Sequence, residues 1–482
     1  MTTTLPELHT GLLLDGRWVP GSGGTYDILD PATEAHVASV AVASPDDVEA
    51  AVAATKRGFA VWRATDAWTR SAVLRRAADL IRDRVDSIAQ VMTAEQGKPL
   101  AEARGEILAA ADQYDWYADE ARRLYGRIVD GHGPGSRIFV RREPIGVVAA
   151  FSTWNFPALL ASRKIAPALA AGCGVIVVPA EETPLTALLL VQALIDAGLP
   201  DGVVNTLTGH VAAISDQVVT HPDVPKISLT GSVPVGQAVL RAAAEGIKDV
   251  SLELGGHAPV LVFADANLQT AAQACVAAKF RNAGQVCASP SRFFVEAPAL
   301  EQFSEHFVSA AQRLVVGDGR DAATTVGPLT NGRRLAAAEA MVADATSGGA
   351  QLALGGGRPA GFATGHFFNP TVLTGVRDDA RVMTDEPFAP VAPITPFDSL
   401  DEALARANAV DVGLASYVFT TSLDTAFAAS DGIEAGMVAV NHMAIATAEA
   451  PFGGNKKSGF GREGGSEGIL DYTTAKFVSM AL

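Results

Sequence analysis

Apolar residues recur at helical spacing through the first quarter of the chain. Ser44, Pro45 and Asp47 form a typical helix start, because Ser44 is a good N-cap, Pro45 suits the first helical position and the Asp47 carboxylate suits the positive end of the helix dipole. The pattern continues to about Leu124, and the Gly and Pro of EQGKPL (95–100) interrupt it. We therefore expect two long helices separated by a break at this stretch.

From residue 146 onwards, short apolar strands alternate with segments at helical spacing. This alternation predicts a parallel sheet covered by helices on both faces, the doubly wound architecture, in which ligands bind at the carboxyl ends of the strands. The expected strands are residues 146–151, 174–179, 203–209, 226–231 and 250–254, and the expected helices are residues 157–172, 184–198 and 234–246.

A second series of elements begins at about Ala258 and predicts a second α/β domain. Residues 442–465 are rich in Gly, Ala and Ser, which is typical of a loop that lies against a ligand or another domain. The expected strands of this series are residues 258–263, 292–297, 436–441 and 473–478, and the expected helices lie near residues 267–283, 298–314 and 334–347.

Length, charge and cysteine count limit the classes of function. A chain of 482 residues exceeds the usual size of one hydrophobic core, and its formal charge of −16 argues against a nucleic-acid or anionic-membrane surface. No signal-peptide pattern and no apolar run of membrane-spanning length is present, so we expect a cytoplasmic protein without a membrane partner. Cys173, Cys275 and Cys287 are too few and too scattered for a disulfide framework or a zinc site, so we expect reduced thiols and no metal.

Cys287 is the first candidate for chemistry. It lies in FRNAGQVCAS (280–289), a polar stretch broken by glycine, where a thiolate is accessible and backbone N–H groups at a bend stabilise its charge. The alternative, a small buried hydrophobe, fits Cys173 and Cys275 better because both lie in apolar segments.

Three further stretches carry polar groups at predicted strand ends. Asn155 follows a strand, where its amide is either an oxyanion donor or a helix cap. Glu253 ends an apolar strand, where it is either a general base with a raised pKa or one half of a buried ion pair. Ser232 precedes a helix opened by Pro234, an end that suits a pyrophosphate, although GxGxxG is missing.

Seven motifs in order, TWNFP, VPAEETP, LTGSVPVG, LELGGHAPVLV, FRNAGQVCAS, DEPFAPV and PFGGNKKSGFGREG, resemble those of the aldehyde dehydrogenase superfamily. The resemblance runs from about Asp15 to the C-terminus and is strongest to the succinate-semialdehyde and 2-oxoglutarate-semialdehyde dehydrogenases. It implies an NAD-binding domain (1–125 and 143–253), a catalytic domain (254–447), an oligomerisation element (126–142 and 466–482) that forms a homodimer or homotetramer, and a connecting loop (448–465).

The resemblance also implies a mechanism, the NAD(P)-dependent oxidation of an aldehyde to an acid through a cysteine thiohemiacetal and thioester. Cys287 would attack the aldehyde, and the Asn155 amide with the Cys287 N–H would hold the oxyanion. Glu253 would activate the hydrolytic water, and Lys164 would help to move the proton away.

By the same resemblance, each part of the ligand has its own residues. Arg163 and Arg281 match two arginines that bind a substrate carboxylate, which guanidinium groups pair with well. The implied cofactor-binding residues are Thr153, Trp154, Val178, Glu181, Gly209, Thr230, Gly231, Ser232, Leu254, Glu386 and Phe388, and the implied substrate-binding residues are Arg163, Arg281, Thr447, Phe156 and the pair after the nucleophile, Ala288 and Ser289.

The chain departs from the family pattern at three positions. Val178 replaces a usual lysine while Glu181 is retained to repel a 2′-phosphate, so we expect NAD to be preferred over NADP. Ala389 replaces a usual glycine beside Phe388, which leaves the placement of that ring open. Ser289 stands where many succinate-semialdehyde enzymes have a second cysteine, so no thiol–disulfide switch is expected.

Several functions stay open at this stage. A sulfolactaldehyde or lactaldehyde would suit the same arginines as a semialdehyde. A CoA-acylating dehydrogenase would also use the cysteine, but Glu253 favours water as the acceptor. A cysteine hydrolase would need a histidine partner that no motif supplies, and a non-catalytic binding protein would not need all three central groups.

Overall fold

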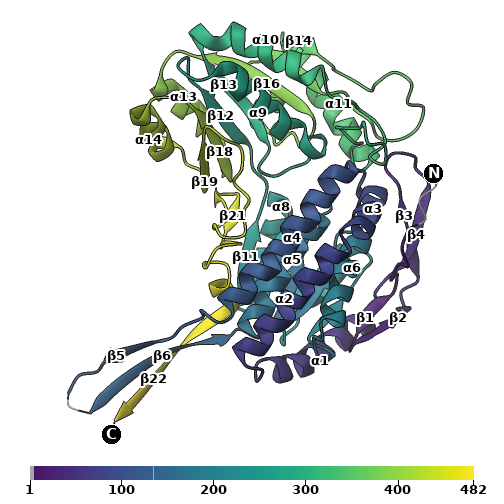
Figure 1. Cartoon of the computed structure of the whole chain (residues 1–482), viewed down its shortest axis with the longest axis vertical. Coiled ribbons are helices and arrows are strands. Elements are labelled where there is room, and N and C mark those ends of the chain that lie inside the picture. The colour runs from purple at the N-terminus through teal and green to yellow at the C-terminus, as the bar shows by residue number, and fades with distance from the viewer. Residues whose placement is uncertain (1–4, 134, 482) are drawn as a thin grey trace.

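The computed structural model describes residues 5–133 and 135–481 and has two α/β bodies and a projecting arm (Figure 1). Residues 1–4 of the predicted NAD-binding domain, and residues 134 and 482 of the predicted oligomerisation element, lie outside the described residues. Among the described residues, none of the helices has the length and apolar character that crossing a membrane requires.

Residues 5–120 contain two short hairpins and a helical layer. The predicted start of α1 is confirmed, because Ser44 and Asp47 form a reciprocal capping box. The expectation of two long helices was wrong: Asp66 caps a new helix and Arg84 ends it, so four helices replace two. The predicted break at Gly97 is confirmed. The elements are β1 (Leu12–Leu14), β2 (Arg17–Val19), β3 (Thr25–Leu29), β4 (His36–Ala41), α1 (Pro45–Trp62), α2 (Ala67–Asp83), α3 (Val85–Gln96) and α4 (Leu100–Glu120).

A six-stranded sheet forms the centre of the first body. Its order is β21-β11-β10-β7-β8-β9, in which the five strands from β11 to β9 are parallel. The predicted strands and helices are confirmed, and α7 was missed. The elements are β7 (Val147–Phe151), α5 (Pro157–Ala171), β8 (Gly174–Val178), α6 (Pro184–Asp196), β9 (Val204–Thr206), α7 (Val211–Thr220), β10 (Lys226–Thr230), α8 (Val233–Glu245) and β11 (Asp249–Glu253).

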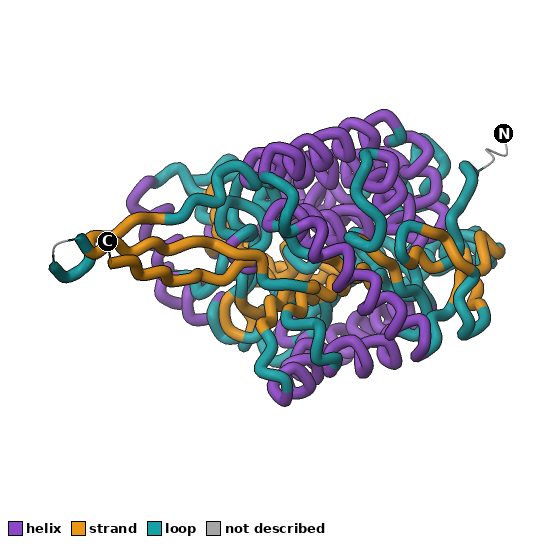
Figure 2. Tube along the Cα trace, turned by 90° about the horizontal axis from the view of Figure 1, so that it is seen from below, coloured by secondary structure: helices purple, strands orange, loops and turns teal. Residues whose placement is uncertain are grey.

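This sheet is buried on both faces, as the doubly wound prediction requires. Val148 and Ala150 of β7 pack with α2, α4, α5 and α6, whereas Val147 and Ala149 pack with the opposite core beneath α1 and α8. Seen from below, helices lie on both sides of the layer of strands (Figure 2). The chain leaves β7 towards β8 on one side and reaches β10 on the other, so the topological switch point lies between β7 and β10.

A seven-stranded sheet forms the second body, in the order β14-β15-β16-β13-β12-β18-β19. It confirms the predicted second α/β series. Its elements are β12 (Ala258–Val262), α9 (Leu268–Phe280), β13 (Pro290–Glu296), α10 (Leu300–Ala311), α11 (Gly332–Ser347), β14 (Gln351–Leu354), β15 (Thr371–Thr374), α12 (Arg381–Thr384), β16 (Val391–Phe397), α13 (Leu400–Ala407), β17 (Val412–Gly413), β18 (Ala415–Phe419), α14 (Leu423–Gly432) and β19 (Met437–Val440).

The arm is an antiparallel sheet of β5 (Arg127–Asp130), β6 (Ser136–Pro144) and β22 (Thr473–Ala481). The strand predicted at 473–478 therefore belongs to the arm and pairs with β6 along its whole length. Figures 1 and 2 show the arm extending away from both bodies. Ile128 and Phe477 are exposed on it, which leaves apolar side chains uncovered in a single chain.

The segment between the second body and the arm returns to the first body. Residues 448–465, expected as a loop, contain β20 (Asn455–Lys456), which pairs with β17, and β21 (Gly459–Phe460), which pairs with β11. The last strand of the six-stranded sheet is therefore supplied from the C-terminal part of the chain.

Candidate active site

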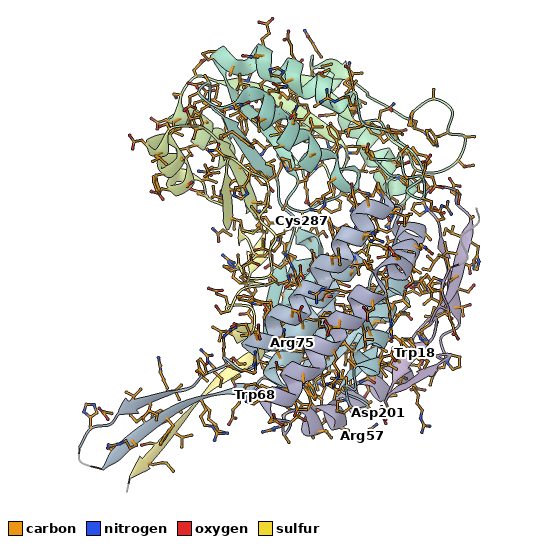
Figure 3. All side chains as sticks on the ribbon, in the orientation of Figure 1. Trp18, Arg57, Trp68, Arg75, Asp201 and Cys287 are labelled. Atoms are coloured by element: carbon orange, nitrogen blue, oxygen red, sulfur yellow. The ribbon has the colours of Figure 1, made fainter. Side chains whose placement is uncertain are left out.

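The carboxyl ends of the parallel strands in the six-stranded sheet open onto a cavity of about 650 Å³, which we call the strand-edge cavity. It lies at the switch point, where ligands bind in doubly wound sheets. Figure 3 places Cys287 between the two bodies. Twelve predicted residues line this cavity: Thr153, Trp154, Asn155, Glu181, Thr230, Gly231, Ser232, Glu253, Leu254, Cys287, Glu386 and Phe388.

Cys287 lies in a turn between the 3₁₀ segment Arg281–Gly284 and β13, as the glycine-broken pattern predicted. The Tyr417 hydroxyl donates a hydrogen bond to the main-chain oxygen of Ala288 at 2.7 Å and fixes the turn. Burial, followed by the nearby Glu386 carboxylate, raises the pKa of the Cys287 thiol to about 12. The thiol is thus held neutral here, and a base must take its proton before it attacks.

Asn155 lies in the turn between β7 and α5, as predicted, and is buried. Its Nδ2 donates to the main-chain oxygen of Gln285 at 3.1 Å, in the loop that leads to Cys287. The Thr153 hydroxyl donates to its Oδ1 at 2.8 Å. The side-chain amide is therefore oriented with its NH₂ group towards the cysteine loop, and it does not cap α5.

Glu253 ends β11, as predicted, and is 4% exposed. Its Oε2 has no hydrogen-bond partner among the described residues. Burial, followed by the negative charge of Glu463, raises the pKa of Glu253 well above its usual value, against the lowering effect of Lys164. Within the described part of the chain Glu253 makes no ion pair, which favours the general base over the structural alternative.

Lys164 does not line the cavity but lies buried on α5, where its ammonium group pairs with Glu463. Glu463 is buried as well, and it comes from the segment after β21. The sequence analysis missed Glu463, although it stands inside the quoted motif PFGGNKKSGFGREG. Its charge raises the pKa of Glu253, so the three groups form one electrostatic unit.

Ser232 is the N-cap of α8 and is exposed, yet its side chain makes no capping hydrogen bond. The first N–H groups of α8 and this hydroxyl are therefore available to an anion. The Thr230 hydroxyl, at the end of β10, is buried and has no partner among the described residues. This end of the cavity fits the pyrophosphate of a dinucleotide.

Glu181 accepts a hydrogen bond from the Val211 N–H at 2.8 Å and lines the cavity next to Glu182. Val178 and Gly209, predicted beside it, do not line the cavity. Val178 ends β8, and its side chain is buried in the core between the sheet and α1. Gly209 is buried with a φ of 124°, and a Cβ there would meet Val42.

Glu386 accepts a hydrogen bond from the Gly256 N–H at 3.2 Å. A Cβ at Gly255 would collide with its carboxylate, so this close approach requires glycine. Burial raises the pKa of Glu386 to about 7. Arg334, which the sequence analysis missed, donates to the main-chain oxygens of Pro387 and Phe388 at 2.7 and 3.1 Å.

Arg163 lies behind the cavity on α5 and is 1% exposed. Its guanidinium carbon is 4.2 Å from the centre of the Phe452 ring, and its Nε and Nη2 have no hydrogen-bond partner among the described residues. Its charge lowers the pKa of both Cys287 and Glu253, so it acts on the thiol and the carboxyl together. A buried guanidinium without an anion points to a ligand.

Arg281 is exposed and stacks over the Phe156 ring at 5.0 Å. Ser289 is buried and turned towards the backbone, because its hydroxyl donates to the main-chain oxygen of Pro290 at 3.4 Å. Ala288 is also buried. The structure therefore places these predicted substrate residues around the cysteine turn rather than in the lining of the strand-edge cavity.

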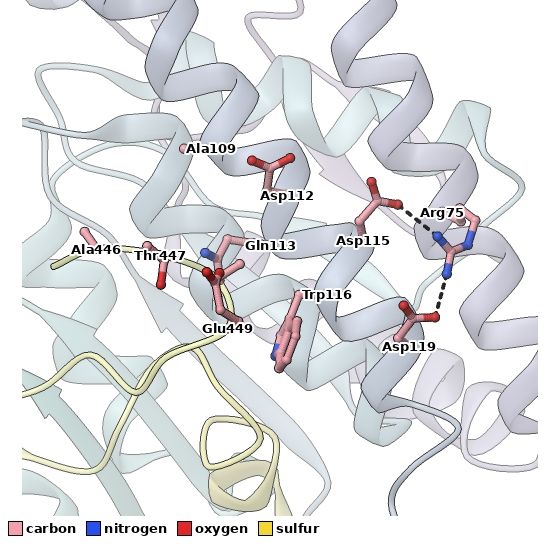
Figure 4. Close-up of a pocket in the computed structure, with 11 residues that line it drawn as sticks. Arg75, Ala109, Asp112, Gln113, Asp115, Trp116, Asp119, Ala446, Thr447 and Glu449 are labelled. Atoms are coloured by element: carbon pink, nitrogen blue, oxygen red, sulfur yellow. Dashed lines mark hydrogen bonds and ion pairs between the residues drawn. The ribbon is translucent and has the colours of Figure 1, made fainter. Parts of the chain in front are cut away.

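Thr447 is exposed and lines a second cavity of about 540 Å³, which we call the α4 cavity. Figure 4 shows it between α4 and the loop 446–449, with Arg75 paired to Asp115 and Asp119. The structure does not bring Thr447 together with the residues of the strand-edge cavity, since the two linings share no residue.

Comparison with known proteins extends over nearly the whole chain. Residues 18–478 match the family described as "Aldehyde dehydrogenase family". The chain is 41% identical over 471 residues to the succinate-semialdehyde dehydrogenase GabD of Escherichia coli, whose name specifies NADP(+), covering 98% of this chain and 97% of the relative.

Of two further similar proteins, one has a different substrate in its name and one has the same. A 3-sulfolactaldehyde dehydrogenase of Pseudomonas putida is 42% identical over 468 residues, covering 97% of this chain and 96% of the relative. The solved structure of succinate-semialdehyde dehydrogenase from Burkholderia pseudomallei has a TM-score of 0.98 at 39% identity, covering 100% of both chains. These matches confirm the resemblance seen in the motifs, and the chain belongs to the aldehyde dehydrogenase family.

Proposed function

We propose that this protein oxidises a short semialdehyde with a distal carboxylate to the dicarboxylic acid, with NAD(P) as the cofactor. The observation that carries this proposal is Arg163, whose buried guanidinium lacks an anionic partner among the described residues and acts on the Cys287 thiol. A carboxylate at one end of the substrate would pair with Arg163 while its aldehyde lies at Cys287. Arg281, beside the cysteine turn, is a secondary contact in this proposal, whereas Thr447 lines the separate α4 cavity and has no part in it.

The roles of the chain's own residues follow from their surroundings. Cys287 attacks the aldehyde carbon after its proton passes to a neighbouring carboxylate, and the Asn155 amide with the Cys287 N–H stabilises the oxyanion. Glu253 then takes a proton from the water that hydrolyses the thioester. Glu463, which is ion-paired with Lys164 and whose charge acts on Glu253, accepts that proton in turn.

The cofactor fits the strand-edge cavity, and NAD(P) supplies the hydride acceptor when it is bound. Ser232 and the N-terminus of α8 would hold its pyrophosphate, and Thr230 and Gly231 would line the same end. Glu386 would bind a ribose hydroxyl, with Phe388, Trp154, Thr153 and Leu254 around the nicotinamide.

We further propose that NAD is preferred over NADP. Glu181 and Glu182 line the cavity, so a 2′-phosphate beside them would meet negative charge. Val178 offers no cation to offset that charge. The E. coli relative carries NADP(+) in its name, so the two proteins are expected to differ at this point.

Several acid-bearing aldehydes of different length and acid group would suit Arg163. Succinate semialdehyde and 2-oxoglutarate semialdehyde both present a carboxylate to Arg163. A sulfonated aldehyde is the second candidate, because the Pseudomonas putida relative is named for 3-sulfolactaldehyde and a sulfonate would pair with the same guanidinium.

The test of this function is the Arg163→Gln variant, assayed with succinate semialdehyde, 2-oxoglutarate semialdehyde, 3-sulfolactaldehyde and propanal. Loss of a buried charge pair should lower kcat/KM for the anionic substrates by about 10²-fold or more relative to propanal, whose own loss reports the effect of the Arg163 charge on Cys287 and Glu253. The exposed Arg313→Gln variant is the matched control. Equal losses on propanal and on the anionic aldehydes would refute the role of Arg163.

We also propose that the protein assembles into a homodimer or homotetramer through the arm. Its support is the exposed apolar side chains of Ile128 and Phe477, which lie on opposite faces of the arm, and the open strand edges of a three-stranded sheet. Phe477→Glu should shift the mass measured by light scattering towards the monomer.

A further inference from the structure

The break between α3 and α4, which the sequence marks as EQGKPL, lies directly against the Asn155 turn. Lys98 in this break is 1% exposed, and its Nζ donates a hydrogen bond to the main-chain oxygen of Asn155 at 2.7 Å. The same ammonium group lies 4.1 Å from the centre of the Phe156 ring. A buried lysine therefore holds the backbone of the residue whose side chain faces the cysteine loop.

Glu106 of α4 fixes Lys98 in this place. The two side chains form a fully buried ion pair. The second carboxylate oxygen of Glu106 accepts hydrogen bonds from the N–H groups of Ala158 and Leu159 at 2.9 and 3.2 Å, at the start of α5. This one ion pair is thus hydrogen-bonded both to the turn that carries Asn155 and to the start of α5, the helix that follows the turn.

A second set of hydrogen bonds joins the same turn to the cysteine loop, residues 281–288. Asn282 Nδ2 donates to the main-chain oxygen of Asn155 at 2.9 Å and lies 3.3 Å from the main-chain oxygen of Gln285. Asn282 has a φ of 48°. Gln96 and Glu102 hold it there, through hydrogen bonds of 3.0 Å to its side chain and 2.8 Å from its N–H.

We propose that Lys98 is a positioning residue, which together with Asn282 sets the Asn155 amide at the place where the oxyanion on the Cys287 adduct forms. The main-chain oxygen of Asn155 then has two donors, from the first body and from the cysteine loop, so the turn cannot rotate independently of the nucleophile. This inference rests on the proposed role of Asn155 as the oxyanion donor. Positioning errors of about 1 Å cost catalysis on the order of 10²-fold.

The test compares single-turnover rates of reduced cofactor formation. Lys98→Met alone leaves the Glu106 carboxylate buried without its cation, so the variant to use is Lys98→Met with Glu106→Gln, whose amide oxygen still accepts from α5. A second variant, Asn282→Gly, keeps the left-handed backbone and removes the amide. Both should lower the rate about 10- to 100-fold while KM for the aldehyde and Kd for the cofactor stay within about threefold. Arg104→Gln, on the exposed side of α4, is the matched control.

The deciding measurement combines these changes with Asn155→Ala. If Lys98 acts through Asn155, the double change Lys98→Met with Glu106→Gln should slow the Asn155→Ala enzyme by less than about twofold. If the Lys98→Met with Glu106→Gln change slowed the Asn155→Ala enzyme as much as it slows the parent, the positioning role would be overturned. An unchanged rate when Lys98→Met with Glu106→Gln is made in the parent enzyme would overturn it as well. An Asn155→Ala enzyme that turns over normally would instead overturn the oxyanion role of Asn155 itself, so the two failures are distinguishable.

Discussion

Trp154 and Phe388 meet edge to face, with ring centroids 5.4 Å apart and ring planes at 86°. Trp154 follows β7 in the first body, and Phe388 follows α12 in the second, so the contact joins the two bodies at the cavity. Phe388 has a φ of 45°, and the Arg334 guanidinium holds its main-chain oxygen. With Ala389 buried beside it, the ring still lines the cavity despite the loss of the usual glycine.

Cys287→Ser should abolish aldehyde oxidation, with kcat lower by about 10³-fold or more, because a serine hydroxyl in this setting is a far weaker nucleophile than a thiolate. The measurement is the steady-state formation of reduced cofactor with the preferred aldehyde. Cys275→Ala, in the core of the second body, is the matched control and should keep its activity. A Cys287→Ser enzyme at the parent rate would contradict the mechanism.

Asn155→Ala should lower kcat by about 10²- to 10³-fold with little change in KM, since an oxyanion donor acts mainly in the transition state. The Thr153 hydroxyl, which holds the Asn155 Oδ1 at 2.8 Å, gives a milder comparison. Thr153→Val removes the hydrogen bond that orients the Asn155 amide and keeps the amide itself, so its effect on kcat should be smaller than that of Asn155→Ala. A large rise in KM for Asn155→Ala at constant kcat would speak for simple substrate binding.

The sequence allowed the strands near the site to be placed because β7 is apolar throughout and β10 and β11 alternate apolar with polar residues. Asn155, Glu253 and Ser232 lie at the ends of β7, β11 and β10, so a strand prediction already places them at one edge. Asp66 also carried a usable signal, since it is a good N-cap that marks the start of α2. β1 and β2 are three residues long, too short for a periodic pattern.

Contacts between distant segments were beyond the reach of a local pattern. Lys164 and Glu463 are 299 positions apart, and Asn155 and Gln285 are 130 apart. Neither spacing follows from helical or strand periodicity. The burial of Arg163 against Phe452 was also beyond a local pattern, because it depends on the return of the C-terminal segment to α5.

Glu386→Gln should change how stability depends on pH. Burial raises the pKa of Glu386 from 4.5 to about 7, so between these values the folded protein binds a proton that the unfolded chain has released. The carboxyl therefore contributes stability that is lost as the pH rises to about 7. The Tm of the Glu386→Gln variant minus the Tm of the parent should rise between about pH 5 and 7, because only the parent loses stability there, and should then level off.

The control for this titration is Glu339→Gln, on the exposed side of α11. Its Tm difference from the parent should stay flat over the same range. A flat difference for Glu386→Gln as well would mean that the carboxyl is ionised throughout, contrary to the burial argument.

Glu181→Ser should raise kcat/KM with NADP by about tenfold and change the value with NAD by less than about threefold. The physical reason is the removal of a negative charge from the end of the cavity where a 2′-phosphate would lie. The readout is the ratio of kcat/KM for the two cofactors. A parent enzyme that already prefers NADP would overturn the proposed NAD preference.

The return of the C-terminal segment has a consequence for biosynthesis. The ribosome reaches Glu463 299 residues after Lys164, and β21 is also made long after the five strands that it completes. N-terminal regions fold first during synthesis. A nascent chain that has not yet reached Glu463 therefore holds the Lys164 ammonium group without its partner, which favours late closure of the first body.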